Sequence, residues 1–339
     1  MNAAGDEVIL LAHGGGGRRT RALIDELIVA ALGNPILNRL DDAACLSLPS
    51  GELVFTTDSY VVDPIFFPGG DIGRLAICGT VNDLAVQGGE PRYLSMALIL
   101  EEGLAVRDLR TILQSMAGAA REARVQVVTG DTKVVERGRG SGVYVNTSGI
   151  GVRLPGVDVG VARCRPGDAV LVSGTIGDHG VAVMSRRQGL RFDTDLVSDV
   201  APLWSLVRPL FLEVPGLRCL RDPTRGGLAA ALCDMAAASS VAIRIEERAI
   251  PVRREVHGAC RLLGLDPLNV ANEGKVVLVC AAEQAERALR ILRAHPCGAQ
   301  AQLIGQVAPE PCGMVLLHTT AGGERILEMP SGEDLPRIC

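Results

Sequence analysis

The sequence predicts an α/β protein of two domains, each built from layers of helices and strands. Its 339 residues exceed the size at which a single hydrophobic core usually stops growing, which is about 250 residues. Segments with a helical period alternate along the chain with short apolar runs. Proline and glycine cluster in "RLPGVDVGVARCRPGD", residues 153–168, and this composition indicates a boundary between the two domains.

The elements follow from the spacing of the apolar residues. Four segments have the helical period, namely residues 18–32, 71–86, 106–123 and 283–294. Strands are predicted for "ELVFTT", "YLSMALIL", "VQVVT", "VYVNTSGIG", "DAVLVS", "KVVLVC" and "GMVLLH". This alternation favours α/β or α+β layers over a helix bundle or an all-β sandwich. We expect domains at residues 1–155 and 156–329, and a mobile tail at residues 330–339, "PSGEDLPRIC".

Composition argues against several classes of protein. A net charge of -5 and 3% aromatic residues are unlike those of a nucleic-acid binder. No stretch approaches the roughly 18 consecutive apolar residues of a membrane span, and the first residues do not resemble a signal peptide. The ten cysteines include no C-x-x-C pair. This pattern predicts a reduced, cytoplasmic protein without a structural zinc site.

Four consecutive glycines precede a predicted helix in "HGGGGRRTRALIDEL". Glycine lets backbone N–H groups approach an anion closely, and the start of a helix adds a favourable dipole. The segment matches neither of the two familiar nucleotide-binding fingerprints. We predict phosphate binding by these glycines; a flexible N-terminal arm is the alternative. They are Gly14, Gly15, Gly16 and Gly17.

Acidic side chains stand beside or within apolar elements of the first half. Asp42 precedes "AACLSL", Asp58 ends "ELVFTTD", and Asp131 follows "VQVVTG". Asn82 and Asp83 lie inside an apolar helix, where an acid is costly to bury unless it is paired or bound. Oxygen-rich sets without His or Cys suit Mg²⁺. We predict that the four aspartates bind Mg²⁺ and that Asn82 joins them in nucleotide binding, although each alone is typical of a turn or cap.

Two further residues are candidates for proton transfer. Lys133, in "TGDTKVVERG", follows Asp131 by two residues, so it could neutralise phosphates or act as a base. Glu273, in "VANEGKVVLV", precedes an apolar strand, which suits a general base that faces a cleft. A surface lysine and a β-turn are the alternatives. The Gly-rich turns "RDPTRGGLAAAL" and "SGTIGDHG" fit phosphate binding and close helix–strand packing equally well.

Taken together, these segments resemble one family over nearly the whole chain. "HGGGG", "VVDPIFFPGGDIGRLAICGTVNDLAV", "TGDTKVVERG", "NTSGIG", "DPTRGGLA", "NEGK" and the terminal "PRIC" are similar to HypE, the carbamoyl dehydratases of [NiFe]-hydrogenase maturation. "DPTRGG" and the dispersed aspartates are shared with aminoimidazole ribonucleotide synthetase, selenophosphate synthetase and thiamine-monophosphate kinase. Gly15 departs from the serine expected in that family, which removes a hydroxyl but keeps the backbone donors.

The resemblance implies a function for the final residue, Cys339. In this family the terminal thiol receives a carbamoyl group from the carbamoyltransferase HypF. ATP then drives its dehydration to a thiocyanate, and the cyanide passes to iron on the HypC–HypD complex. The resemblance also implies a homodimer formed by the amino-terminal domains, with Lys133 and Glu273 as candidate bases.

Two other functions are alternatives to this one. Selenophosphate synthetases carry a reactive Cys or selenocysteine and a Lys in their N-terminal Gly-rich segment, and "HGGGGRRTR" has neither. A non-catalytic scaffold for maturation factors would not need the combined set of acids and Lys133. The sequence therefore favours the ATP-dependent dehydratase.

Overall fold

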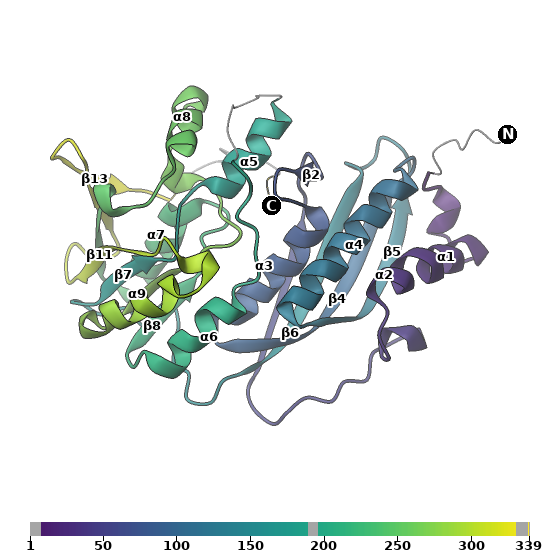
Figure 1. Cartoon of the computed structure of the whole chain (residues 1–339), viewed down its shortest axis with the longest axis horizontal. Coiled ribbons are helices and arrows are strands. Elements are labelled where there is room, and N and C mark those ends of the chain that lie inside the picture. Colours follow the sequence, from purple (N-terminus) through teal and green to yellow (C-terminus); the bar gives the residue numbers. More distant parts are fainter. Residues whose placement is uncertain (1–7, 189–195, 330–337, 339) are drawn as a thin grey trace.

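The computed structural model describes residues 8–188, 196–329 and 338. Two α/β units lie side by side, and each is built around its own sheet (Figure 1). The first unit contains a four-stranded sheet of order β1-β6-β4-β5, in which only β4 and β5 run parallel. Its strands are β1 (Leu53–Tyr60), β4 (Gly89–Glu101), β5 (Gln126–Val135) and β6 (Val143–Arg153).

Two long helices cover one face of this sheet (Figure 1). They are α3 (Ile72–Val86) and α4 (Val106–Ala123). Helix α3 begins where the Asp71 carboxylate accepts hydrogen bonds from the backbone N–H groups of Gly73 and Arg74, as an N-cap residue does. Almost every residue of α3 is buried, so this helix forms the centre of the first core rather than its surface.

The opposite face of the first sheet has no such cover among the described residues. Leu53, Phe55 and Ile99 are 59%, 68% and 42% exposed on that face. Monomeric proteins normally bury aromatic and aliphatic side chains of this size in a sheet, so an uncovered apolar face indicates an interaction surface.

Short elements complete the first unit. The helix predicted for residues 18–32 is confirmed, although it is continuous only through a π-helical stretch, Ile24–Val29, between α1 (Arg18–Leu23) and α2 (Ala30–Leu32). A hairpin of β2 (Phe66–Phe67) and β3 (Gly70–Asp71) leads into α3.

The second unit contains a seven-stranded sheet of order β13-β12-β9-β11-β7-β10-β8, antiparallel except between β12 and β9. Its strands are β7 (Ala169–Val172), β8 (Leu217–Arg221), β9 (Ala242–Glu246), β10 (Val277–Cys280), β11 (Gln302–Ala308), β12 (Val315–His318) and β13 (Glu324–Leu327). Its helices are α5 (Asp178–Arg187), α6 (Trp204–Glu213), α7 (Gly227–Ser239), α8 (Arg254–Leu263) and α9 (Ala285–Arg293).

The predicted α/β layers are confirmed, and so are the predicted strands, each of which lies in one of the two sheets. The sequence analysis predicted neither α6 nor α8. Helix α6 contains Pro209 and buries only Leu206, Val207 and Leu210. The helical period of its apolar residues therefore extends over too few positions to be recognised in the sequence. Between the two sheets the chain runs from Arg153 to Ala169, the Pro- and Gly-rich segment in which the boundary is predicted.

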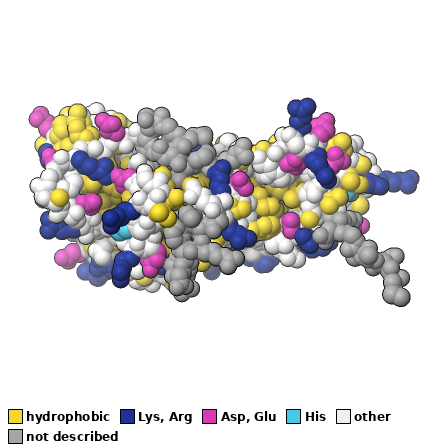
Figure 2. Space-filling model, turned by 90° about the horizontal axis from the view of Figure 1, so that it is seen from above, with side chains coloured by type: hydrophobic (Ala, Val, Ile, Leu, Met, Phe, Trp, Pro, Cys, Tyr) yellow, Lys and Arg dark blue, Asp and Glu magenta, His cyan; other side chains and the backbone are white. Residues whose placement is uncertain are grey.

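Charged side chains of both signs are scattered over the face seen in Figure 2, on both units. None of the helices in the described ranges combines the length and the apolar character that crossing a bilayer requires.

Candidate active site at the junction of the two domains

Four carboxyl groups converge where the two units meet. Asp58 and Asp83 come from β1 and α3 of the first unit, whereas Asp222 follows β8 and Glu273 precedes β10 in the second. They line one small cavity of about 40 Å³ together with Ser59, Tyr60, Gly79, Thr224 and Arg225. Residues more than 200 positions apart thus share one acidic cluster. Asp58, Asp83, Asp222 and Glu273 are called the acidic cluster below.

Threonines at the interface of α3 and β1 orient the two acids of the first unit. Thr56 Oγ1 donates a hydrogen bond to Asp83 Oδ2 at 2.8 Å, and Thr80 Oγ1 donates one to Asp58 Oδ2 at 3.3 Å. The helix can approach the strand this closely because residue 79 is glycine: a Cβ there would lie 2.2 Å from the Tyr60 hydroxyl oxygen. Any larger side chain at position 79 would separate Asp58 from Asp83.

Burial and mutual repulsion raise the pKa values of three members of the acidic cluster, namely Asp83, Asp222 and Glu273. Burial, followed by the charges of Asp222 and Asp58, raises the pKa of Asp83 to about 7. Burial also raises the pKa of Asp222 to about 6. The pKa of Glu273 lies well above its ordinary value because the side chain is buried and faces Asp222, Asp199 and Asp58, although Arg225 opposes the shift. Raised carboxyl pKa values of this kind are typical of sites for proton transfer or cation binding.

The junction around the acidic cluster is fixed by Asn82. Its side-chain amide donates to the carbonyl oxygens of Ala201 and Glu273, at 3.0 and 3.2 Å, and its oxygen accepts the N–H of Leu203 at 2.7 Å. Asn82 is only 1% exposed. Asn82, which we predict to bind nucleotide, thus joins α3 to the loop that carries Glu273.

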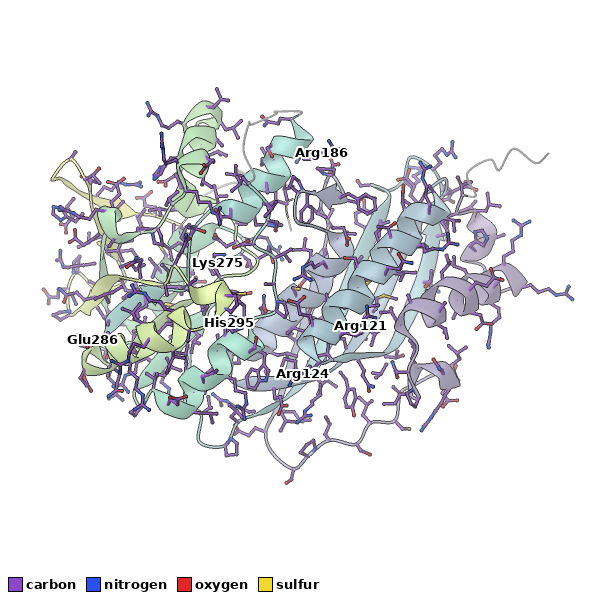
Figure 3. All side chains as sticks on the ribbon, in the orientation of Figure 1. Arg121, Arg124, Arg186, Lys275, Glu286 and His295 are labelled. Atoms are coloured by element: carbon purple, nitrogen blue, oxygen red, sulfur yellow. The ribbon has the colours of Figure 1, made fainter. Side chains whose placement is uncertain are left out.

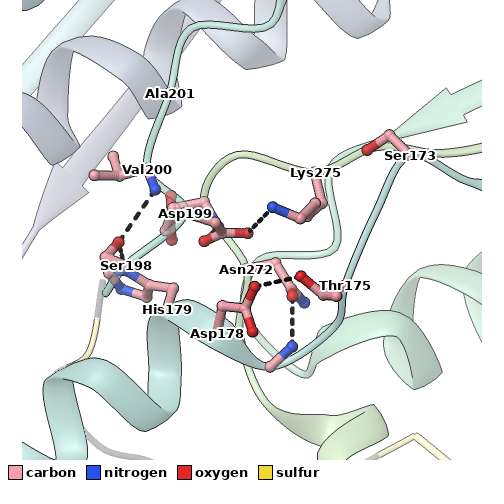
Figure 4. Close-up of polar contacts among 12 residues, drawn as sticks. Ser173, Thr175, Asp178, His179, Ser198, Asp199, Val200, Ala201, Asn272 and Lys275 are labelled. Atoms are coloured by element: carbon pink, nitrogen blue, oxygen red, sulfur yellow. Dashed lines mark hydrogen bonds and ion pairs between the residues drawn. The ribbon is translucent and has the colours of Figure 1, made fainter. Parts of the chain in front are cut away.

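A buried ion pair supports the same loop (Figure 4). Asp199 Oδ1 accepts the backbone N–H of Glu273 at 3.1 Å, and its Oδ2 lies 3.1 Å from Lys275 Nζ. Figure 3 places Lys275 inside the second unit, in contrast to the surface residue Glu286. Asp199 therefore contacts both ends of the segment 273–275. Removal of either Asp199 or Lys275 would leave an unpaired charge in a buried place, which is strongly destabilising.

The remaining predicted residues of the first half lie in a different place. Asp131 and Lys133 are neighbours on the exposed face of β5, where their charged groups are 3.4 Å apart and about two-thirds exposed. The glycine-rich segment packs against the same strand, since a Cβ on Gly14 would lie 2.6 Å from the backbone N of Val134. The structure thus brings Gly14, the first of the four glycines, close to Lys133, but not to Asp58 and Asp83.

A larger pocket of about 270 Å³ opens beside Asp131. Apolar side chains of residues 24–37 form one wall, and residues 127–132 of β5 form another. Asp42 lines an adjoining pocket of about 280 Å³ with Phe55, Tyr93 and Ser148 on the exposed face of the first sheet. A largely apolar pocket with acidic side chains in its lining has the character of a small-molecule site.

The predicted four-aspartate metal set is therefore divided between two places. Among the described residues, no three His, Cys, Asp or Glu side chains are arranged so that they alone could hold a metal ion. Mg²⁺, however, normally takes only one or two carboxylates and completes its shell with water and phosphate oxygens. The acidic cluster offers carboxylate oxygens, and the buried Glu273 Oε1 has no hydrogen-bond partner within the part of the chain that the structure describes. These donors fit Mg²⁺ bound together with a phosphate group.

Sequence reasoning missed three residues of this region. Asp222 was visible in "RDPTRGG", directly after a strand and before proline, but was not selected as a ligand. Nothing in the sequence pairs Asp199 with Lys275, the lysine of "NEGK", because their contact exists only in the folded junction. Cys339, the predicted carrier, lies outside the described residues.

The raised pKa of Asp83 predicts how stability changes with pH. A carboxyl whose pKa is raised on folding stabilises the protein fully below its ordinary pKa of 3.8, and this contribution is lost as pH rises through about 7. Asp83→Asn, which is neutral at every pH, should therefore raise the free energy of unfolding by on the order of 2 kcal/mol near pH 8. Near pH 4 the variant and the parent chain should unfold alike.

Denaturant titrations at both pH values, without nucleotide or metal, would measure this difference. Asp41→Asn is a matched control because Asp41 is exposed and outside the acidic cluster. Equal free energies of unfolding for the Asp83 variant and the parent chain at the higher pH would contradict the raised pKa of Asp83.

Comparison with known proteins agrees with this architecture. Residues 40–153 match the family described as AIR synthase related protein, N-terminal domain, and residues 165–316 match the corresponding C-terminal domain. The carbamoyl dehydratase HypE of Azotobacter vinelandii is 52% identical over 329 residues, which cover 97% of this chain and 96% of that protein.

Solved structures give the same result. HypE in complex with ATP matches with a TM-score of 0.94 at 50% identity, covering 97% of this chain and 99% of that one. HypE from a HypE–HypF complex matches with a TM-score of 0.80 at 48% identity, covering 91% and 100%. A two-domain chain with this identity along almost its entire length belongs to the HypE family of carbamoyl dehydratases.

Proposed function

We propose that the chain uses ATP to dehydrate a carbamoyl group carried on the sulfur of Cys339, giving a protein thiocyanate. The observation that supports this most directly is the position of Glu273. Its Oε1, which has no hydrogen-bond partner in the described ranges 8–188, 196–329 and 338, is buried in a cavity shared with Asp58, Asp83 and Asp222. Those three acids could hold a cation that binds a phosphate group. The ATP complex of a HypE half identical to this chain supports the choice of nucleotide.

The reaction balances in two steps. The carbamoyl oxygen accepts the γ-phosphoryl group of ATP, which releases ADP and turns a poor leaving group into a good one. The C–O bond then breaks, phosphate departs with that oxygen, and both protons leave the nitrogen as the C≡N bond forms, one going to the departing phosphate and the other to a base. The second step therefore requires a base that can take a proton next to departing phosphate.

Glu273 is the residue we assign to this proton transfer. Its raised pKa makes its carboxylate a stronger base than that of an exposed glutamate. Lys133 is exposed and paired with Asp131 on the other side of the first sheet, a position that suits contact with nucleotide phosphates better than proton abstraction in the acidic cluster.

We assign nucleotide binding to the pocket beside Asp131 and to Gly14, Gly15, Gly16 and Gly17. The apolar wall of that pocket suits a purine, and the exposed glycine backbone suits phosphate oxygens. Mg²⁺, when bound with phosphate, would supply positive charge to the transferring group. Asp58 and Asp83 are the carboxylates proposed to hold it in the junction, and Asp42 and Asp131 those near the nucleotide pocket.

The proposed partners follow from the same assignment. HypF would supply the carbamoyl group, as the solved HypE–HypF complex suggests, and the HypC–HypD complex would receive the cyanide. We also propose a homodimer formed through the uncovered face of the first sheet, where Leu53, Phe55 and Ile99 are exposed. A cytoplasmic location remains a prediction from the cysteine pattern; the nine described cysteines are all free thiols.

The proposal is tested by mass spectrometry of the C-terminal peptide. The chain is incubated with the carbamoyl donor system, first without ATP and then with it. We expect the peptide to gain the mass of a carbamoyl group in the first incubation and to lose one water molecule in the second. If ATP leaves the carbamoylated peptide unchanged, the chain only accepts the carbamoyl group or serves as a scaffold, and the proposed dehydration is wrong.

A further inference from the structure

The residue before the terminal cysteine is held inside the molecule. Ile338 is only 4% exposed, and its backbone carbonyl accepts a hydrogen bond from His179 Nε2 at 2.7 Å. Its side chain belongs to the buried apolar cluster of the first unit, which also includes residues of the second: Val183, Met184, Val200 and Ala271. Chain ends normally fray, so burial of a penultimate residue requires a site that binds it.

His179 is prepared for this contact by its own surroundings (Figure 4). Its Nδ1 lies 2.8 Å from Ser198 Oγ, and that oxygen also accepts the backbone N–H of Val200 at 3.1 Å. A carbonyl oxygen can only accept, so Nε2 must carry the proton that His179 donates to Ile338. Burial lowers the pKa of His179 and favours the neutral ring, so Nδ1 accepts the Ser198 hydroxyl hydrogen.

The ring is also held from the first unit. Phe67 meets the imidazole edge to face, with ring centroids 5.4 Å apart and planes at 89°. The carbonyl of the next residue, Pro68, accepts the N–H of Ser198 at 2.8 Å. Contacts from both domains therefore fix the ring plane and the tautomer of His179. Its Nε2–H group points at the carbonyl oxygen of Ile338.

We propose that His179, Ser198 and Phe67 form a binding site for the penultimate residue of this chain. The ligand is Ile338 itself, whose apolar side chain is buried and whose carbonyl oxygen accepts the His179 hydrogen. No residue of the acidic cluster contacts Ile338 through a hydrogen bond among the described residues, so this site is distinct from the place of proton transfer.

The consequence for the reaction rests on the proposed function. Consecutive Cα atoms are about 3.8 Å apart, so binding of Ile338 limits where the Cys339 backbone can be. Ala271, in the same apolar cluster as Ile338, precedes Glu273 by two residues. His179 thereby acts as a positioning residue, which sets the carrier thiol relative to the base.

Carboxypeptidase digestion of the full chain tests the binding site without any reaction. The enzyme needs several free terminal residues, so the rate at which it releases Cys339 and Ile338 follows the population in which Ile338 has left its site. Loss of one buried hydrogen bond in His179→Ala should raise this rate about three- to tenfold. His179→Gln retains an N–H donor and should restore slow release.

Two further variants show whether faster release is specific to the contact between His179 and Ile338. Ile338→Gly removes the apolar side chain but leaves His179, Ser198 and Phe67 unchanged, and it should accelerate release at least as much as His179→Ala. His257→Ala changes an exposed histidine of α8 and should digest like the parent chain. Release at the parental rate from both His179→Ala and Ile338→Gly would overturn the proposal.

A second measurement addresses positioning. With carbamoylated chain, His179→Ala should form thiocyanate about tenfold more slowly while ATP affinity stays unchanged, and His179→Gln should recover much of the rate. Equal rates in His179→Ala and the parent chain would refute the positioning role. If the parent chain itself forms no thiocyanate, the proposed function fails, yet the digestion result still decides the binding site.

Discussion

Glu273→Gln should accept a carbamoyl group on Cys339 at the normal rate and then fail to dehydrate it. Gln has nearly the same shape as Glu but cannot take a proton, and loss of a general base slows such reactions by about 10²- to 10⁴-fold. The measurement is the ATP-dependent loss of one water from the C-terminal peptide, followed over time by mass spectrometry. The fold should persist, because the change removes a carboxyl from a buried acidic cluster in which Asp58, Asp83 and Asp222 remain.

The pH dependence of dehydration gives an independent check on Glu273. The carboxylate must be deprotonated to act as a base, and its pKa is raised well above the ordinary value. The rate should therefore increase as pH rises through that pKa, and the variant should lose this dependence. Glu283→Gln is the matched control because Glu283 is exposed. Normal thiocyanate formation by Glu273→Gln would make Glu273 a structural turn residue.

Cys339→Ala should lose all carbamoylation and all thiocyanate, while ATP still binds. No other group can replace the thiol at the chain end, since alanine has no nucleophile and, in Cys339→Ser, oxygen cannot pass cyanide on as sulfur can. Addition of two residues after Cys339 should be nearly as damaging, because it displaces the terminal carboxylate and crowds the place where the chain ends. The measurement is again the mass of the C-terminal peptide, together with calorimetry of ATP binding.

Cys312→Ser is the control for Cys339. Cys312 is an exposed free thiol in the last thirty residues of the chain, and its Sγ lies 3.4 Å from the Pro309 carbonyl oxygen. Its replacement should leave dehydration intact. Thiocyanate production by Cys339→Ala, or by a chain lacking residues 330–339, would refute the assignment of the carrier.

The layers of the fold could be predicted because local patterns determine them. Alternating apolar residues in "ELVFTT" and "VYVNTSGIG" mark β1 and β6, and the apolar run of residues 71–86 marks α3. The order of the strands could not be predicted in this way. Pairing of β1 with β6, and of β12 with the distant β9, depends on contacts between segments that no local period encodes.

The site was predictable by residue type but not by arrangement. Asp131 and Lys133 are two positions apart in a strand, so a common face follows from the sequence. That this face is the one without α3 and α4 depends on the whole sheet. Asp58 and Asp83 meet because α3 lies across β1, and Asp222 joins them only because the second domain packs against the first.

The bridge made by Asn82 has a consequence for how this molecule can work. Many two-domain enzymes close around a substrate by a hinge, and binding energy is then spent on bringing the catalytic groups together. Here the amide of Asn82 already ties the helix of Asp83 to the backbone of Glu273, so a rotation of the domains would have to break buried hydrogen bonds. Asp83 and Glu273 are thus already in place before the reactants bind. The entropy lost in reaching the transition state is then mainly that of the thiocarbamate and the nucleotide, not that of a domain movement.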